Sequence, residues 1–285
     1  MKKIGLFISL TAAAVAHEAS AADLTVCPAG CQHVTIQSAI DSSRAGDVIH
    51  IAAGTYFENL LVPNRRLTLL GAGQDLTQID GRNRGTVVTL GAPSDETPQT
   101  VSIIGVTITH GSAQFGGGIL VNDVALDLEN SIVSSNSATM NGGGIELTGI
   151  KVPARIIGTL VAHNRAGAFG GGIAVEVESQ AQVSGSSITR NTAGQRGGGF
   201  WGQGASLSSI QTTTISDNSS RQDGGGLYIE TGLPHAALSL ANSSVVGNKA
   251  VDGGGIFNAG RLTTTGTIVT GNNAPNDITQ IPVTR

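Results

Sequence analysis

The sequence predicts an all-β protein, a single-stranded right-handed parallel β-helix of about nine or ten coils with a short N-terminal capping helix. Two repeated phrases and one residue pattern predict this fold. A Gly-Gly-Gly run followed by an apolar residue recurs at intervals of 26, 28, 27, 27 and 29 residues. The runs begin at Gly116, Gly142, Gly170, Gly197, Gly224 and Gly253. Self-similarity at this period is typical of stacked units, each too small to bury its apolar face alone.

The second phrase is an aliphatic residue, two further residues and an asparagine, repeated at a similar interval. Its asparagines are Asn136, Asn164, Asn191, Asn218, Asn248 and Asn272. An asparagine at the same place in every coil can adopt a left-handed backbone and hydrogen-bond to its equivalents above and below. Three glycines allow a tight turn and a close approach between coils, because no Cβ intervenes. Both phrases are therefore interpreted as scaffold.

The segments between these phrases have strand character. They are rich in Val, Ile, Thr and Ser, and their apolar residues tend to alternate, as in residues 173–177. A period of two indicates strands, and each repeat has room for about three short ones. Stacked coils pair equivalent strands in parallel at about 4.8 Å. The handedness rule for parallel crossovers predicts a right-handed wind.

The composition fits such a core and argues against one class of partner. Aromatic residues make up 3% and charged residues 13% of the 285 residues, whereas glycine occurs 41 times. Ladders of small aliphatic side chains can fill a solenoid, but an ordinary globular core would need more large side chains. The formal net charge is −4, and no contiguous basic stretch predicts a nucleic-acid partner.

Residues 1–21 have the features of a secretory signal peptide. Lys2 and Lys3 precede an apolar stretch over residues 4–16, and residues 19–21 form a small-residue cleavage site. The apolar stretch is too short to span a bilayer, and no other stretch approaches a transmembrane length. We expect the mature protein to be secreted, periplasmic or held at the cell surface.

The mature chain is expected to begin with an N-terminal cap over residues 22–47. Cys27 and Cys31 are the only cysteines, and in an exported protein they are expected to form a small disulfide. Residues 48–285 are assigned to the parallel β-helix, with regular repeats over residues 105–273.

A short helix is predicted within the cap. Ile36, Ala39 and Ile40 share one helical face, and Gly46 is the predicted stop. The helix would cover the open end of the solenoid, which otherwise exposes unpaired strand edges.

The opening of the predicted β-helix carries a group of short motifs. They are Thr35-Ile36-Gln37, Ala39-Ile40, Gly46-Asp47, Gly54-Thr55-Tyr56, Glu58-Asn59 and Leu69-Leu70-Gly71-Ala72-Gly73. These motifs resemble the opening of pectin-lyase-like right-handed parallel β-helix proteins, pectinesterases among them. The later Gly-Gly-Gly-Ile and Asn-x-Ala units resemble bacterial extracellular β-helix repeats and, more loosely, polymorphic outer-membrane protein repeats. The resemblance covers roughly residues 24–280 and implies the fold, but this fold carries many unrelated functions.

The catalytic signatures of the enzymes in this resemblance are missing. Nothing matches the Gly-x-x-Asp-Phe-Ile-Phe-Gly stretch of pectinesterases, or the Asn-Thr-Asp, Asp-Asp and Gly-His-Gly motifs of polygalacturonases. Calcium-dependent pectate lyases need clustered carboxylates, usually beside a basic residue. Asp217 and Asp223 with Arg190 or Arg221 are the residues that could be placed so. Ca²⁺ is therefore the one cofactor left open, and no metal site is otherwise expected.

The glycine runs also predict which residues face outward. If the residue after each run points into the core, the next one points away from it. These outward residues are Leu120, Glu146, Ala174, Trp201, Tyr228 and Phe257. The last three fall on consecutive coils and predict an exposed aromatic ladder. Two positions further on, the same face carries Asn122, Thr148, Glu176, Gln203 and Glu230.

An aromatic strip flanked by carboxylates and amides is suited to holding sugars, so this face is the candidate ligand-binding surface. Its candidate residues are Glu146, Glu176, Trp201, Gln203, Tyr228, Glu230 and Phe257. The alternative is that the stacked aromatics only stabilise the ladder or line a contact with a partner.

A second row precedes the asparagines and offers a candidate catalytic cluster. Its members are His110, Ser135, His163, Arg190 and Asp217. His163, Arg190 and Asp217 would lie on neighbouring coils about 5 Å apart, which is compatible with acid–base chemistry. The alternative, which we prefer, is a solvated row of polar turn residues.

Two functions are weighed. The first is an exported β-helix that acts by surface contact, through polysaccharide or cell-envelope binding or adhesion. The second is a polysaccharide lyase or related enzyme that acts on an acidic polysaccharide. The interval between glycine runs varies by only three residues, which leaves few long loops to wall a catalytic groove and favours the first function. No oligomeric state is predicted.

Overall fold

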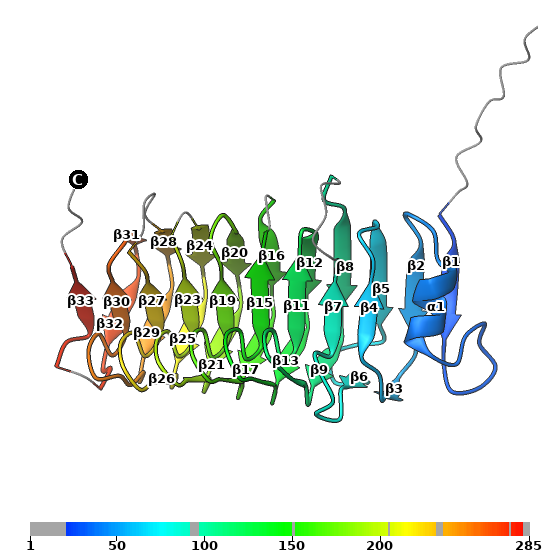
Figure 1. Ribbon diagram of the computed structural model, residues 1–285, viewed down its shortest axis with the longest axis horizontal. Helices are drawn as coiled ribbons and strands as arrows, with labels where there is room; N and C mark the ends of the chain where they lie inside the picture. Colours follow the sequence, from blue (N-terminus) through cyan, green and yellow to red (C-terminus); the bar gives the residue numbers. More distant parts are fainter. Residues whose placement is uncertain are drawn as a thin grey trace, which may run out of the picture.

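The computed structural model describes residues 21–91, 97–149, 152–204, 206–231, 236–273 and 275–281. This part of the chain is an all-β parallel solenoid of about nine turns, with one short helix, α1 (Ile36–Ser42), at its N-terminal end (Figure 1). The predicted fold class is thereby confirmed. The predicted signal peptide lies outside the described residues, apart from Ala21.

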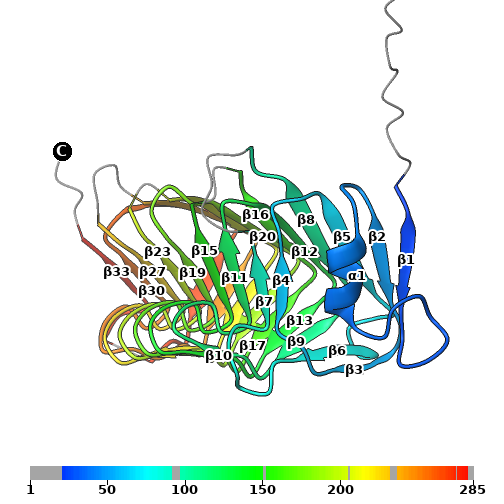
Figure 2. The same ribbon diagram turned by 45° about the vertical axis from the view of Figure 1, so that its right-hand side comes forward.

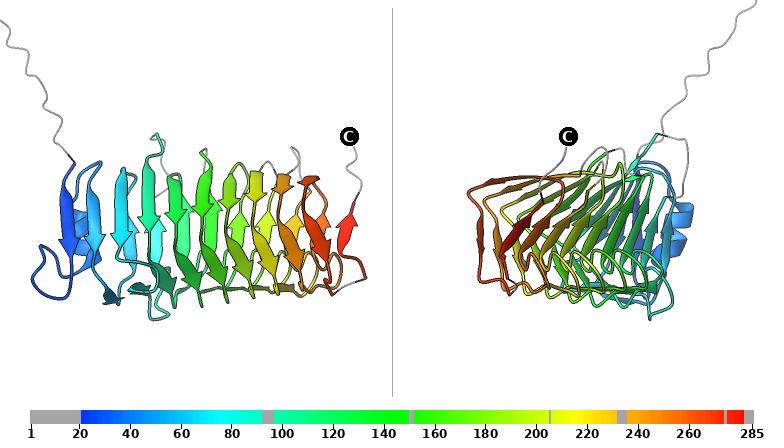
Figure 3. Two further views of the ribbon diagram at one scale, coloured as in Figure 1. Left: turned by 180° about the vertical axis from the view of Figure 1, so that it is seen from behind. Right: turned by 60° about the vertical axis from the view of Figure 1, so that its left-hand side comes forward.

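Three long parallel sheets run along the solenoid (Figure 3). Sheet A comprises β1 (Asp23–Val26), β2 (Val48–Ile51), β5 (Leu67–Gly71), β8 (Thr100–Ile104), β12 (Ala125–Glu129), β16 (Ala154–Ile157), β20 (Ala181–Ser184), β24 (Leu207–Gln211), β28 (Ala237–Ala241) and β31 (Arg261–Thr265). Sheet B comprises β3 (Gly54–Tyr56), β6 (Thr77–Asp80), β9 (Thr107–Thr109), β13 (Ile132–Ser134), β17 (Leu160–Ala162), β21 (Ser187–Thr189), β25 (Thr214–Ser216), β29 (Ser244–Val246) and β32 (Ile268–Thr270). Sheet C comprises β4 (Leu60–Val62), β7 (Val88–Leu90), β11 (Ile119–Asn122), β15 (Ile145–Thr148), β19 (Ile173–Val175), β23 (Phe200–Gly202), β27 (Leu227–Ile229), β30 (Ile256–Asn258) and β33 (Ile278–Gln280).

A fourth sheet, sheet D, was not foreseen in the expectation of about three strands per repeat. It comprises the two-residue strands β10 (Ser112–Ala113), β14 (Ser137–Ala138), β18 (Arg165–Ala166), β22 (Thr192–Ala193) and β26 (Ser219–Ser220). The last four follow directly after the repeated asparagines. Neighbouring coils therefore remain in parallel register beyond the asparagine turn, on the way to each glycine run.

The asparagines form a continuous buried ladder, as predicted. Each side-chain Nδ2 from Asn136 onward donates to Oδ1 of the asparagine one coil on, at 2.9–3.1 Å. The same Oδ1 atoms accept the backbone N–H of the preceding asparagine. The ladder ends on Asp277, whose Oδ1 accepts both the backbone and side-chain N–H groups of Asn272, at 2.8 and 3.0 Å. Each coil is thus locked to the next by side-chain as well as backbone bonds.

The glycine runs form the tight turns and the close approaches between coils that the sequence predicts. The first glycine of each run has φ between +55° and +66°, a conformation that glycine adopts without steric cost. At the middle position there is no room for a side chain. A Cβ on Gly198 would lie 2.4 Å from the carbonyl oxygen of Gly225 and 2.5 Å from that of Ser219.

The residue after each glycine run points into the solenoid, as expected. Ile119, Ile145, Ile173, Phe200, Leu227 and Ile256 are all buried in one apolar core. The aliphatic residues that open the second phrase, among them Val133 and Ile188, belong to the same core. Stacked small aliphatic side chains therefore fill the solenoid.

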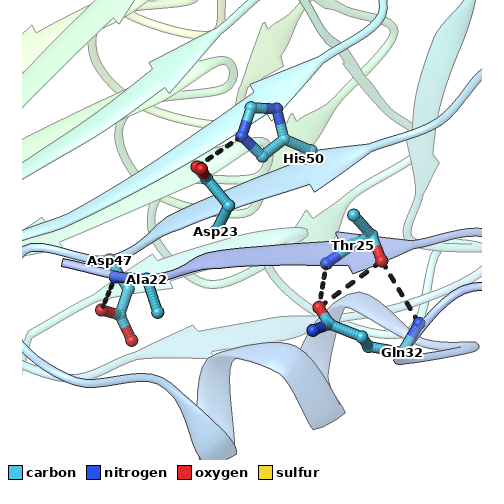
Figure 4. Close-up of polar contacts among 6 residues, drawn as sticks. All are labelled: Ala22, Asp23, Thr25, Gln32, Asp47 and His50. Carbon is cyan, nitrogen blue, oxygen red and sulfur yellow. Dashed lines mark hydrogen bonds and ion pairs between the residues drawn. The ribbon is translucent and has the colours of Figure 1, made fainter.

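The N-terminal region differs from the predicted cap in one respect. β1 pairs in parallel with β2, so the first strand of sheet A lies inside residues 22–47. Figure 4 shows two contacts that fix it: Asp47 Oδ1 accepts the backbone N–H of Ala22 at 2.7 Å, and His50 Nε2 lies 2.8 Å from Asp23 Oδ1. The hydrogen bond from Ala22 holds the pKa of Asp47 below its ordinary value.

The predicted disulfide and helix are both present. Cys27 and Cys31 are bonded, with their Cα atoms 5.5 Å apart. α1 begins at Ile36 after the N-cap Thr35, and its buried residues are the three predicted, Ile36, Ala39 and Ile40. The helix ends at Ser42, because the Ser43 backbone and hydroxyl both donate to Ile40 O. The predicted stop, Gly46, instead lies in the following turn with φ +96°.

α1 covers the edge of sheet C at the N-terminal end (Figure 2). Leu61 N on β4 donates to Gln37 Oε1 at 2.9 Å, and Gln37 Nε2 donates to Leu61 O at 3.2 Å. The side-chain amide therefore pairs with the edge strand as a peptide group would. The Glu58 carboxylate accepts the N–H groups of Ile36 and Gln37 at 2.8 and 2.9 Å, and satisfies the start of the helix.

Within the described chain, α1 is too short to cross a bilayer, and no helix there has the length and hydrophobicity that crossing requires.

Candidate functional site

The outer face of sheet C is covered along much of its length by the loops that precede the glycine runs. The outward residues of the strands are the predicted ones, in register from coil to coil. The first glycine of each run lies directly over one of them: a Cβ on Gly197 would meet Trp201 Cβ at 2.8 Å, and one on Gly224 would meet Tyr228 Cβ at 2.8 Å. The residue before each run is thereby brought beside the same face. These covering residues are Phe115, Asn141, Phe169, Arg196, Asp223 and Asp252.

We call this covered face the outer strip. It consists of the covering residues, the outward residues Leu120, Glu146, Ala174, Trp201, Tyr228 and Phe257, and the polar residues Asn122, Thr148, Glu176, Gln203 and Glu230.

The aromatic ladder forms in the predicted register, but the expectation that it is exposed is wrong. Trp201, Tyr228 and Phe257 are only 2%, 5% and 7% exposed. Phe169 stacks on Trp201 with ring centroids 4.9 Å apart, and Tyr228 stacks on Phe257 at 5.1 Å. These rings form a second apolar cluster outside the solenoid core, together with Ala174 and Ala259. The structure therefore favours the alternative in which the stacked aromatics stabilise the fold.

Charged residues close over the C-terminal part of this cluster. The Arg196 guanidinium lies 5.0 Å from the centre of the Tyr228 ring, 3.6 Å from Asp223 Oδ2 and 3.8 Å from Glu230 Oε1. Burial raises the pKa of Glu230, Arg196 opposes the rise, and Glu176 adds to it. Burial also raises the pKa of Asp223, again against the effect of Arg196. Arg196 is thus held between two carboxylates and is not free to neutralise a third.

A pair of carboxyl groups lies further toward the N-terminal end of the outer strip. Glu146 is 2% exposed, and Asn141 Nδ2 donates to Glu176 Oε1 at 2.9 Å. Burial raises the pKa of Glu146 well above its ordinary value, and its hydrogen bond with Glu176 and the charge of Glu176 raise that pKa further. Both effects favour the neutral form of Glu146, because a charge there would be poorly solvated and would repel the Glu176 carboxylate.

Beside this pair the covering loops leave a pocket of about 330 Å³. It is lined by Phe115, Leu120, Asn122, Glu146, Thr148 and Glu176. An aromatic ring and an aliphatic side chain therefore face carboxyl, amide and hydroxyl groups, the mixture that is typical of small-ligand sites. Its size lies at the low end of the range of about 300–1,000 Å³ for such sites.

Unpartnered polar atoms mark the same region. In the part of the chain that the structure describes, six buried side-chain polar atoms have no hydrogen-bond partner, and five of them belong to the outer strip. The five are Asn141 Oδ1, Glu146 Oε2, Arg196 Nε, Trp201 Nε1 and Glu230 Oε2. Buried polar groups are normally satisfied, so this concentration distinguishes the outer strip from the other described parts of the solenoid, and one of the five atoms, Glu146 Oε2, belongs to the pocket lining.

The predicted ligand-binding residues thus divide into two groups. Glu146 and Glu176 line the pocket, together with Asn122 and Thr148 from the same predicted face. Gln203 and Glu230 lie further along the strip and do not line the pocket, while Trp201, Tyr228 and Phe257 are buried beneath the cover. Phe115 was missed from the sequence. Its signal was its place directly before the first glycine run, where its equivalents also cover sheet C.

The second predicted row is a row of turn residues. His163, Arg190 and Asp217 follow in-register strands of sheet B and have φ of +57°, +55° and +55°. All three are exposed, and no hydrogen bond or ion pair joins them. The left-handed turn directs their side chains into solvent, so the structure agrees with the solvated-turn alternative.

The residues considered for Ca²⁺ lie on different parts of the coil. Asp217 and Arg190 belong to the turn after sheet B, whereas Asp223 belongs to the outer strip and faces Arg196. Across the described residues, no group of three or more His, Cys, Asp or Glu side chains is placed to hold a metal ion.

A larger hollow, of about 390 Å³, lies on the outer face of sheet A. Its lining contains small hydroxyl side chains such as Ser209 and Ser239, the amides of Gln180 and Gln182, and Arg261. None of the side-chain atoms left without a partner belongs to it. The pocket on the outer strip is therefore the stronger candidate site despite its smaller size.

Comparison with curated sequences and solved structures finds distant similarities. No curated protein sequence matches the chain. Among solved structures, pectin methylesterase from carrot is 12% identical, with a TM-score of 0.42 over 85% of this chain and 87% of that one. The A-module of the mannuronan C-5 epimerase AlgE6 of Azotobacter vinelandii is 15% identical, with a TM-score of 0.27 over 87% of this chain and 95% of that one. At these values the similarity says nothing about activity.

The family comparison agrees with the predicted wind. Residues 94–274 match the family model described as the right-handed β-helix region. The resemblance of the repeats to those of polymorphic outer-membrane proteins stays a prediction. The chain belongs to the right-handed β-helix family.

Proposed function

We propose that the protein binds polysaccharide by surface contact, with one sugar ring held in the pocket of the outer strip. The observation that carries this proposal is the convergence of Asn122, Thr148, Glu146 and Glu176 on a pocket whose remaining lining is apolar. A pyranose ring has apolar faces and a rim of hydroxyl groups, so it needs both kinds of contact. The pocket opens beside an extended parallel sheet, along which a chain of sugars can run.

Rigidity of the pocket also supports binding. Asn122 on β11 and Thr148 on β15 are register partners in sheet C. Glu146, also on β15, is held between that strand and the covering loop, since a Cβ on Gly142 would meet Glu146 Cβ at 2.7 Å. A site built on paired strands loses little conformational entropy when a ligand binds.

The carboxyl pair is less suited to the chemistry of glycoside cleavage. Retaining enzymes hold their two carboxyls about 5–5.5 Å apart and inverting enzymes about 6.5–9.5 Å apart. Here the two carboxyls interact closely enough for Glu176 to raise the pKa of Glu146 beyond the larger effect of burial. A lyase acting on an acidic polysaccharide needs a positive group near the sugar carboxylate, and the six described lining residues include none. We therefore favour binding over the enzymatic alternative.

The place of action proposed is outside the cytoplasm, on the strength of the predicted leader in residues 1–21. The test is to express the full chain and identify the N-terminus of the exported protein. Cleavage before Ala22 is expected, and retention of an uncut chain in the cytoplasm would contradict it.

A panel of neutral, acidic and amino polysaccharides, scored for both binding and cleavage, tests the function itself. Binding without cleavage is expected. Asn122→Ala and Phe115→Ala should weaken binding about tenfold, the effect of removing one good polar or stacking contact. Gln182→Ala, in the hollow on sheet A, is the matched control and should bind like the wild type. Binding lost with Gln182→Ala but kept with the other two variants would move the site to sheet A. Depolymerisation by the wild type would establish the enzymatic alternative.

A further inference from the structure

We propose that the pocket takes an unacetylated amino sugar, whose ammonium group lies between the carboxyls of Glu146 and Glu176. The inference rests on the proposed function, which it deepens by naming the class of sugar.

The first support is a surplus of hydrogen-bond acceptors. Glu146 is buried and lines the pocket, and its Oε2 accepts no hydrogen bond. Glu176 receives one N–H, from Asn141 Nδ2 at 2.9 Å. A carboxyl pair has more lone pairs than the surrounding protein satisfies. An ammonium group carries three donors and no acceptor, and so complements the pair.

The second support is the sign of the charge. The six described residues that line the pocket include two carboxyl groups and no cation. The nearest guanidinium on the outer strip, Arg196, is held by Asp223 and Glu230. Next along the strip, the pKa of Glu230 is raised chiefly by burial and further by the charge of Glu176, so Glu230 offers that carboxylate no positive partner. The carboxyl groups of the pocket would repel a uronate and attract an amine.

The third support is the proton that burial favours on the Glu146 carboxyl. From the strands on either side, the residues that flank Glu146 are Leu120 on β11 and Ala174 on β19, which do not titrate. The covering loop contributes Asn141, so Glu176 is the titratable group that faces Glu146. In the free pocket the raised pKa of Glu146 favours its protonated form. A bound ammonium would favour the carboxylate instead, so the proton would be released to solvent.

The apolar side of the pocket suits the same ligand. Phe115 contributes an aromatic ring to the same lining as the carboxyls, and a cation near an aromatic face gains a further attraction. An N-acetyl group on the sugar would remove the positive charge and two of the three donors.

The test compares oligosaccharides of equal length by isothermal titration calorimetry at pH 5 in buffers of different ionisation enthalpy. The probes are chitosan, chitin, cellulose and galacturonate oligomers, and spermidine serves as a free amine. Chitosan oligomers should bind about tenfold or more tightly than chitin or cellulose oligomers, as a charge-assisted pair replaces a neutral contact. Their binding should release about one proton per site, and their affinity should rise with pH through the acid range.

Variants test whether the proton release and the preference for chitosan arise at Glu146 and Glu176. Glu146→Gln and Glu176→Gln keep the shape of the side chain, but each removes one ionisable carboxyl from the pocket. Either should abolish the proton release and reduce chitosan affinity to that of chitin. Glu178→Gln, exposed two residues beyond Glu176, is the matched control and should behave like the wild type. Thermal unfolding of each variant verifies that it is folded.

Failure of the amino-sugar assignment can be distinguished from failure of the proposed polysaccharide binding. Equal affinity for chitosan and cellulose oligomers, or a preference for galacturonate, would overturn the amino-sugar assignment and leave polysaccharide binding standing. Spermidine bound as tightly as chitosan would show a bare ammonium site and overturn the assignment to a sugar. No binding of any glycan would overturn the proposed function itself.

Discussion

The ring of Phe169 lies nearly parallel to the indole of Trp201, with centroids 4.9 Å apart and 15° between the planes. Phe169 comes from the loop before one glycine run, and Trp201 from the strand that follows the next run. The stack therefore ties a covering loop to the sheet beneath it. It also buries Trp201, the only tryptophan in the chain. The fluorescence of Trp201 therefore reports on the outer strip.

Replacing Phe169 by alanine should expose the indole of Trp201 to solvent. We expect a red-shifted Trp201 emission, greater quenching by acrylamide and a loss of about 2 kcal/mol in the free energy of unfolding, less than for a fully buried phenylalanine. Fluorescence and urea unfolding measure the two effects. Phe57→Ala is the control, because Phe57 is exposed under the Arg82 guanidinium elsewhere on the solenoid. An unshifted emission in Phe169→Ala would mean that the loop does not shield Trp201.

The same contact shows why the outer strip could be predicted only in part. Strand alternation correctly gave the direction of Trp201, Tyr228 and Phe257, because inward and outward positions follow from the pleat. Strand alternation could not predict which residues of the loops cover these side chains. The covering residues change type from coil to coil, from Phe169 to Arg196 to Asp223, so no periodic signal identified them as a layer.

The asparagine ladder is the opposite case. The same residue recurs at the same place, so its equivalents had to meet if the coils stack at all. Their hydrogen bonds could be predicted from the sequence for that reason. The pocket required two further things that the pattern does not contain, the position of Phe115 in its loop and the degree to which Glu146 is buried.

Removing one rung of the ladder should destabilise the whole solenoid. Asn191 Nδ2 donates to Val161 O and Asn218 Oδ1, and its Oδ1 accepts from Asn164. Asn191→Ala leaves these buried partners unsatisfied, so we expect a loss of about 3 kcal/mol or more in the free energy of unfolding.

Chemical denaturation followed by circular dichroism measures the loss, with the exposed Asn276→Ala as control. A loss no larger than that of the control would show that the ladder bonds add nothing beyond the backbone pairing.

The middle glycine of a run should tolerate no side chain. A Cβ on Gly198 would meet two backbone carbonyls at 2.4 and 2.5 Å, and backbone cannot move aside as a flexible side chain can. Gly198→Ala should therefore cost about 3 kcal/mol or more, or prevent folding. Gly185→Ala is the matched control, because a Cβ there would meet nothing within 4 Å. With φ of +56° at Gly185, the control should cost about 1–2 kcal/mol. Equal losses in the two variants would contradict the steric explanation.

The carboxyl pair should make stability fall as pH rises. The folded protein keeps a proton on Glu146 above pH 4.5, the ordinary pKa of the group, where the unfolded chain has released it. The folded state thus binds more protons than the unfolded state, and the free energy of unfolding decreases with pH until the raised pKa is passed. For one proton the slope is at most about 1.4 kcal/mol per pH unit. The lowered pKa of Asp47 acts the other way, but its stabilisation is lost only as pH falls through the acid range.

Glu146→Gln should remove the largest part of this dependence, because an amide keeps the shape of the neutral carboxyl and cannot ionise. The raised pKa values of Glu230 and Asp223 leave a smaller part of the same sign. We expect the variant to match the wild type near pH 4.5 and to become progressively more stable than it from pH 5 to pH 8, as measured by urea unfolding at fixed ionic strength. Glu178→Gln, exposed in the turn after β19, should follow the wild type at every pH. A Glu146→Gln variant that loses stability with pH as steeply as the wild type would show that the proton retained on folding does not belong to this pair.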